Sequence, residues 1–198
     1  MKKRKRMKGK TLSSVFVSLL HHCGYGIFKA CYYAASIGRR NLVEERNGQE
    51  QNRERYLTVG RFRKLGKGYE RCCGPTAITN LIMSLQDEKE SPEEIFLSVA
   101  RTGIRRGIYM NMDLFKRFGG TSNVLTEPYI KRCLKQHGVQ AELHYLGRLT
   151  EERLQRALRR GSYLYLELLF HPKYGNHHVL CYGARPAKDG WLLRIADG

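Results

Sequence analysis

The segment Arg71-Cys72-Cys73-Gly74-Pro75-Thr76-Ala77 marks the start of a core helix. Gly74-Pro75 suits a first helical turn, where a proline needs no backbone donor. An apolar stripe at helical spacing follows, namely Ala77, Ile78, Leu81, Ile82 and Leu85. We therefore expect a helix that begins just after Cys73. A thiol at that position lies where backbone N–H groups and the helix dipole stabilise a thiolate; a buried, unreactive cysteine at a helix start is the structural alternative.

Three further helices are expected downstream. Ser91-Pro92-Glu93-Glu94 is a capping box with proline at the first helical position. The next helix runs from about Glu127 to Gln136, and Gly138 after it is typical of a left-handed cap. Thr150 caps the last helix, and Gly161 ends it.

The second half of the chain is rich in strand patterns. Residues 139–145 alternate apolar and polar side chains, as in a half-buried strand. Three apolar strands follow at about residues 163–170, 177–184 and 191–196. Since helices come first and strands joined by short turns come last, the sequence predicts an α+β fold with an antiparallel sheet.

The N-terminal part of the chain differs in composition from the rest. Of the 198 residues, 36 are Lys or Arg and 18 are Asp or Glu, for a net charge of +18. Residues 1–43 contain ten basic residues and no acidic one, so the net charge of residues 44–198 is +8. We interpret residues 1–43 as a basic leader with a short amphipathic helix over Leu12–Leu20, 44–56 as a charged linker, and 57–198 as the globular domain.

This charge indicates negatively charged partners. Nucleic acid, anionic lipid and acidic peptide all fit, but no nucleic-acid-binding motif accompanies the charge. We expect the leader to favour an anionic membrane surface, with a cytoplasmic or membrane-associated protein as the result. No uninterrupted apolar run reaches the length of a membrane-spanning helix. A secretory signal is the rival interpretation of the leader.

The six cysteines lack the regular spacing of a disulfide framework, so reduced thiols are expected. Zinc binding is a second chemical interpretation of Cys72, Cys73, His177 and His178. Adjacent residues on a strand point to opposite faces, and no Cys-x-x-Cys or His-x-x-x-His spacing occurs. We expect neither a metal nor another cofactor.

A histidine pair begins the strand about 100 residues after the cysteines. His177 shares a strand face with Val179 and Cys181, and His178 shares the other with Leu180 and Tyr182. Only one imidazole can therefore face the thiol and act as its base.

A carboxylate follows the next strand. Asp197 can orient the imidazole by accepting its other N–H group. A cysteine at a helix start, a histidine opening one strand and an aspartate closing the next follow the chain order of papain-like thiol hydrolases.

Three motifs carry a closer resemblance across roughly residues 57–198: Cys73-Gly74-Pro75, then Leu149-Thr150-Glu151-Glu152 with the stop at Arg160-Gly161, then His177-x-Val179-Leu180-x-Tyr182-Gly183. Their order resembles the bacterial double-glycine leader peptidases, and more closely the stand-alone bacteriocin-processing-peptidase-like cysteine peptidases. The resemblance implies a papain-like fold, with Cys73 on the helical half and the histidine and aspartate on the sheet.

By this resemblance, Cys73 is the nucleophile of a peptide-hydrolysing enzyme and Cys72 is a bystander. His177 is implied as the base, because it follows Asn176 and precedes Gly183 by six residues, and Asp197 is the orienting acid. The family's oxyanion-hole Gln is replaced by Lys67, with Tyr69 as another donor nearby. That replacement motivates the alternative function, a lapsed peptidase domain that binds a peptide or an anionic surface.

Overall fold

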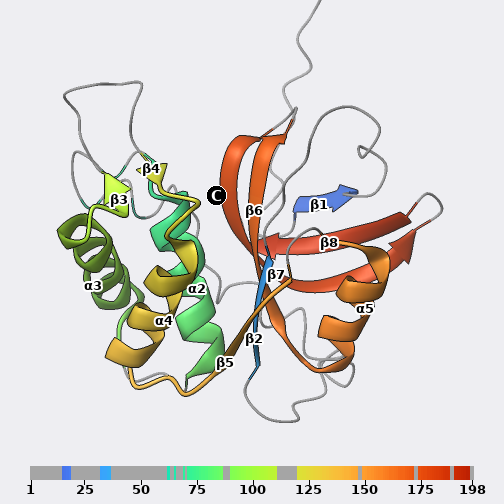
Figure 1. The fold of residues 1–198 in the computed structure, drawn as a ribbon, viewed down its shortest axis with the longest axis horizontal. Helices are drawn as coiled ribbons and strands as arrows, with labels where there is room; N and C mark the ends of the chain where they lie inside the picture. The colour runs from blue at the N-terminus through green and yellow to red at the C-terminus, as the bar shows by residue number, and fades with distance from the viewer. Residues whose placement is uncertain are drawn as a thin grey trace, which may run out of the picture.

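The computed structural model describes residues 15–18, 32–36, 62, 65, 69, 71–86, 90–110, 120–146, 149–171, 174–187 and 190–196. Within them the chain forms a mixed α+β structure with four helices and two antiparallel sheets (Figure 1). The α+β prediction is thereby confirmed. None of the helices in these ranges is long and apolar enough to cross a membrane.

The four expected helices are present as α2 (Cys73–Leu85), α3 (Pro92–Arg105), α4 (Thr126–Gln136) and α5 (Glu151–Arg159). α2 and α4 each begin one residue earlier than predicted. The Ser91 hydroxyl accepts the Glu94 N–H at 3.3 Å, and the Glu94 carboxylate accepts the Ser91 N–H at 3.0 Å, which completes the capping box. The Thr150 hydroxyl caps α5 by accepting the Arg153 N–H. Gly138 and Gly161 have φ of +66° and +68°, the left-handed conformation expected after a helix.

The larger sheet has six antiparallel strands. Their order is β1 (Val15–Ser18), β8 (Gly190–Ala196), β7 (Gly175–Ala187), β6 (Tyr163–His171), β2 (Tyr32–Ser36) and β5 (Glu142–Tyr145). The three expected C-terminal strands are therefore confirmed, while β5 begins at Glu142, three residues later than predicted. A second sheet pairs β3 (Tyr109–Met110) with β4 (Gly120–Thr121).

Two segments of the expected leader belong to the sheet. Val15–Ser18 pairs with β8 as a strand, so the predicted helix over Leu12–Leu20 is wrong there. Tyr32–Ser36 lies between β5 and β6. β-Branched and aromatic residues favour strands, and a sheet edge offers backbone groups for pairing, which outweighs the helical spacing. The basic arm before residue 15 and the linker 44–56 lie outside the described residues.

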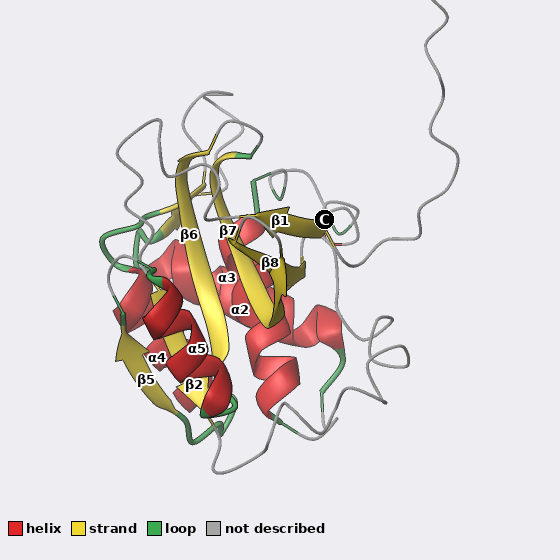
Figure 2. Cartoon of the chain, turned by 90° about the vertical axis from the view of Figure 1, so that its right-hand side faces the viewer, coloured by secondary structure: helices red, strands yellow, loops and turns green. Residues whose placement is uncertain are grey.

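Helices cover both faces of the sheet (Figures 1 and 2), and an apolar core lies on each face. We call the side covered by α2, α3 and α4 the inner face, and Tyr165, Leu180 and Ala196 contribute to it from β6, β7 and β8. The side covered by α5 is the outer face. The sheet residues of its core are Leu164, Leu166, Val179, Cys181, Leu193 and Ile195.

Candidate functional site

The two adjacent cysteines at the start of α2 have different surroundings. Cys72 is fully buried in a small apolar cluster with Phe62, Phe96 and Tyr109, and the Thr76 hydroxyl lies 3.6 Å from its sulfur. Cys73 is the first residue of α2 and is partly exposed. Reagents and substrates can therefore reach Cys73 but not Cys72.

The N terminus of α2 leaves backbone donors beside Cys73. The first helical hydrogen bond runs from the Thr76 N–H to the Cys72 carbonyl at 2.8 Å. Pro75 has no N–H, so the amides of Cys73 and Gly74 are the two without intrahelical partners. Such groups stabilise a thiolate, and they also stabilise an oxyanion formed next to it.

Two other described thiols have raised pKa values. Burial raises the pKa of Cys133 to about 12 and that of Cys181 to about 12, so both are protonated at neutral pH. Burial also raises the pKa of Tyr109, with smaller contributions from Cys72, Tyr69 and Cys73. Tyr109 therefore lies beside the cysteine pair as a neutral phenol.

Thr121 on β4 joins the start of α2 to the sheet. A Cβ built on Gly74 would lie only 2.7 Å from the Thr121 Cβ, so this approach requires glycine. The backbone carbonyl of Thr121 hydrogen-bonds to the His178 ring. The residue after Cys73 and the imidazole of His178 therefore contact the same threonine.

His178, and not His177, lies on the inner face of β7. It shares this face with Leu180, which packs against α2. His177 lies on the outer face with Val179 and Cys181 and stacks on Tyr174, with ring centroids 5.9 Å apart. The structure therefore does not place His177 on the face that packs against α2, where the prediction put it. The sequence motif points to the histidine pair, whereas the strand register decides which member points inward.

Both ring nitrogens of His178 have partners. Nδ1 lies 3.0 Å from the Tyr165 hydroxyl, and a carbonyl such as that of Thr121 can only accept a hydrogen bond. The neutral ring thus donates its N–H to Thr121 and accepts the Tyr165 O–H at Nδ1. Burial, reinforced by nearby His177, lowers the pKa of His178 to about 4, although the Thr121 carbonyl opposes the shift. His178 is therefore a neutral imidazole at pH 7.

Sequence reasoning missed the polar residues around this imidazole. Tyr165 and Glu167 are fully buried on β6, and Glu167 is the cross-strand partner of His178. The signal lies in the alternation of residues 163–168, where Tyr163, Tyr165 and Glu167 share one face and three leucines share the other.

Three further residues are predicted to belong to the site, namely Asp197, Lys67 and Tyr69. Asp197 and Lys67 lie outside the described residues. Tyr69 packs edge-on against Phe96, with ring centroids 5.4 Å apart. In the described ranges, no group of three or more His, Cys, Asp or Glu side chains is arranged to hold a metal ion.

Comparisons with protein-family models, with curated proteins and with solved structures found no match.

Proposed function

We propose that the protein is a papain-like cysteine peptidase with Cys73 as its nucleophile. The carrying observation is a partly exposed thiol at the first position of α2, joined through Gly74 and Thr121 to the strand face that bears His178. Thiol hydrolysis needs a nucleophile, backbone donors and an imidazole. In this proposal the start of α2 contributes the first two, and the sheet contributes the imidazole of His178.

In the proposed reaction, an imidazole takes the Cys73 proton and the sulfur attacks the peptide carbonyl carbon. The N–H groups of Cys73 and Gly74 stabilise the oxyanion. The C–N bond then breaks, the imidazolium protonates the leaving amine, and a thioester remains. Water, deprotonated by the same imidazole, hydrolyses the thioester and restores the thiol.

We assign the base role to His178, in place of the His177 that the resemblance implied. His178 lies on the strand face that packs against α2, whereas His177 lies across the sheet. The hydrogen bonds of His178 set a condition on its action. Its ring must release Tyr165 or Thr121 before it can take a proton from Cys73. In the proposed reaction, the His178 ring bound to both partners is therefore the resting state.

The same hydrogen bonds favour a second candidate, a papain-like domain that binds a peptide without cleaving it. If the Tyr165 and Thr121 bonds are permanent, the imidazole is a buried structural group and Cys73 is an ordinary thiol. Peptide binding would then persist when Cys73 is replaced, and no thioester would form.

Labelling with a peptide-based electrophile separates these candidates. The peptidase requires Cys73→Ala to abolish both labelling and hydrolysis of a mixed peptide library, with a loss of several orders of magnitude. Cys72→Ala is the matched control and should keep most activity, because Cys72 is buried. Prior treatment with iodoacetamide should block the wild type. Hydrolysis that survives Cys73→Ala would contradict the proposal, and peptide binding without labelling would support the second candidate.

A further inference from the structure

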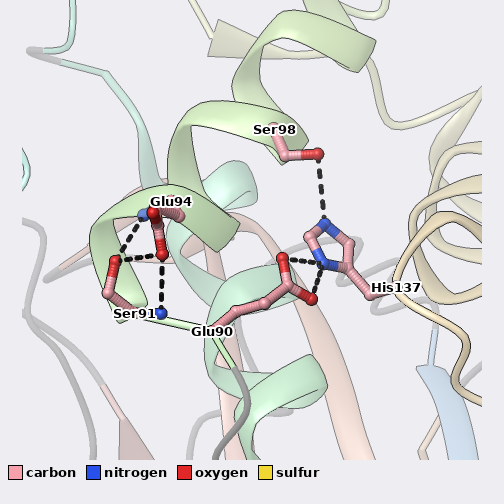
Figure 3. Close-up of polar contacts among 5 residues, drawn as sticks. All are labelled: Glu90, Ser91, Glu94, Ser98 and His137. Atoms are coloured by element: carbon pink, nitrogen blue, oxygen red, sulfur yellow. Dashed lines mark hydrogen bonds and ion pairs between the residues drawn. The ribbon is translucent and has the colours of Figure 1, made fainter.

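A second cluster of reactive side chains lies between α3 and α4, away from Cys73. It consists of Glu90, Ser98 and His137, which we call the α3–α4 cluster. The two carboxylate oxygens of Glu90 lie 2.9 and 3.1 Å from His137 Nδ1, and the Ser98 hydroxyl lies 3.1 Å from His137 Nε2. Figure 3 shows the carboxylate and the hydroxyl approaching the ring at its two different nitrogens.

The partners of the ring fix where its proton lies. A carboxylate only accepts hydrogen bonds, so the neutral His137 ring carries its proton on Nδ1 and donates it to Glu90. Nε2 then has a lone pair and accepts the Ser98 O–H. The His137 side chain is only 4% exposed, while Ser98 is partly exposed on α3. The imidazole is therefore shielded from water, and the hydroxyl that it polarises is within reach of solvent.

We propose that Ser98 is an activated nucleophile that accepts an acyl group from an ester, with His137 as base and Glu90 as the orienting acid. The proton of Ser98 passes to His137 Nε2 while Oγ bonds to the ester carbonyl carbon. The bond to the leaving alcohol breaks, and the imidazolium returns the proton to that alcohol. Water then releases the acyl group with His137 again acting as base. Glu90 stays ionised and stabilises the imidazolium.

Neighbouring side chains indicate the class of ester. One turn after Ser98, the Thr102 hydroxyl donates to the Gln136 side-chain oxygen at 2.8 Å, which orients the Gln136 amide as a donor beside the cluster. Arg101 and Arg105 are exposed and follow Ser98 by three and seven residues, on the same side of α3. A carboxylate or phosphate on the substrate would be bound by these guanidinium groups. The expected substrate is a small ester with a negatively charged acyl group.

The first test uses a fluorophosphonate on the full chain carrying Cys73→Ala, so that the outcome does not depend on the proposed peptidase. Ser98 Oγ attacks phosphorus, the P–F bond breaks and fluoride leaves, while His137 takes the proton. Mass spectrometry of the digested protein should locate the label on Ser98. His137→Ala should slow labelling about 100-fold, the usual scale of general-base assistance. Glu90→Gln should slow it about fivefold, on the scale of losing one charge interaction with a partly exposed carboxylate.

Two control residues each resemble one part of the α3–α4 cluster. Ser84 is another helical serine, whose hydroxyl donates to the Asn80 carbonyl, and it should stay unlabelled. His144 forms an exposed pair with Glu142 at 3.2 Å, and His144→Ala should leave the Ser98 rate unchanged. Thermal melting of each variant checks that it is folded. No label on Ser98 in the folded protein, or equal labelling with and without the His137 imidazole, would overturn the proposal.

The second test addresses the acyl group with two nitrophenyl esters, an acetate and a succinate. The succinate carries the negative charge and should acylate Ser98 about tenfold faster, on the scale of one favourable charge contact near a surface. Replacing Arg101 and Arg105 together with alanine should remove this preference for the succinate. Equal rates for both esters in the protein that retains Arg101 and Arg105 would overturn the assignment of a negatively charged ester.

Discussion

The two faces of β7 place adjacent histidines in opposite environments. On the inner face, His178 is buried and hydrogen-bonded to Tyr165 and to Thr121, whose side chain lies against Gly74 of α2. On the outer face, His177 is partly exposed and stacks on Tyr174. A shift of one residue in a strand exchanges its faces, so register rather than residue type decides which imidazole lies on the face that packs against α2.

The difference also separates two kinds of chemistry. The inner imidazole is buried and hydrogen-bonded to two partners. The hydrogen bonds define its tautomer, and burial lowers its pKa. The outer imidazole lies beside an aromatic ring in a region that solvent reaches. Within the described residues, Thr121 and Gly74 connect the inner environment to the helix that carries Cys73.

The largest effect is expected from truncating the inner core residue next to His178. Leu180→Ala should lower the free energy of unfolding by about 4 kcal/mol, because Leu180 is fully buried against α2. It should also change the alkylation rate of Cys73. Val179→Ala on the outer face should cost about 2 kcal/mol and leave that rate unchanged. Denaturant titration and iodoacetamide kinetics measure both quantities; equal effects on the Cys73 rate would contradict the comparison.

Acidification should destabilise the protein through His178. In the unfolded chain this histidine binds a proton below its ordinary pKa of 6.5, whereas in the folded protein it stays neutral until about pH 4. The free energy of unfolding contributed by this group is complete above pH 6.5 and falls by about 3 kcal/mol as the pH drops to 4. Unfolding titrations across this range should show a shallower slope for His178→Gln than for the wild type. His177→Gln should keep the wild-type slope, and a reversal of these two results would show that the buried imidazole belongs to His177.

A smaller effect is expected where Thr121 meets α2. Gly74→Ala should lower the free energy of unfolding by about 2 kcal/mol, because the new methyl group collides with the Thr121 side chain. Displacing Thr121 should also weaken its bond to His178. Gly183→Ala on β7 is the control, since its Cβ would meet its nearest neighbour at 3.6 Å. Thermal melting compares the two variants, and a Gly74→Ala protein as stable as the control would show that this contact is loose.

The smallest of these stability effects is expected for Tyr165→Phe. It removes the hydroxyl that binds His178 Nδ1 and should cost about 1 kcal/mol, the usual net value of one hydrogen bond. The ¹⁵N resonances of His178 should also change, because its tautomer is no longer fixed from that side. Tyr145→Phe, at an exposed position, should alter neither the stability nor these resonances. Unchanged His178 resonances in Tyr165→Phe would contradict the assigned hydrogen bond.

Much of this fold can be predicted from local signals. The capping box at Ser91, the Thr150 cap and the left-handed glycines act over a single turn, so the sequence contains the whole interaction. The three C-terminal strands are likewise visible as apolar runs. The helix predicted over Leu12–Leu20 is wrong at Val15–Ser18, because the strand state of these residues depends on pairing with β8, about 175 residues later in the sequence.

The candidate site is predictable only in part for the same reason. Cys73 at a helix start is a local feature, and the α2 boundary follows from it. The inner position of His178 depends on the pairing of β7 with β6 and on the packing of α2, which no local pattern specifies. Thr121 joins the site from a two-residue strand that has no signal in the sequence.

The most direct test of the proposed site is the pH profile of iodoacetamide labelling at Cys73 in two variants. If His178 acts on the thiol, His178→Ala should slow labelling near pH 7, because no imidazole remains to take the proton. His177→Ala should match the wild type. A shift seen only in His177→Ala would contradict the assignment of the inner histidine, and identical profiles in all three proteins would contradict the proposed peptidase.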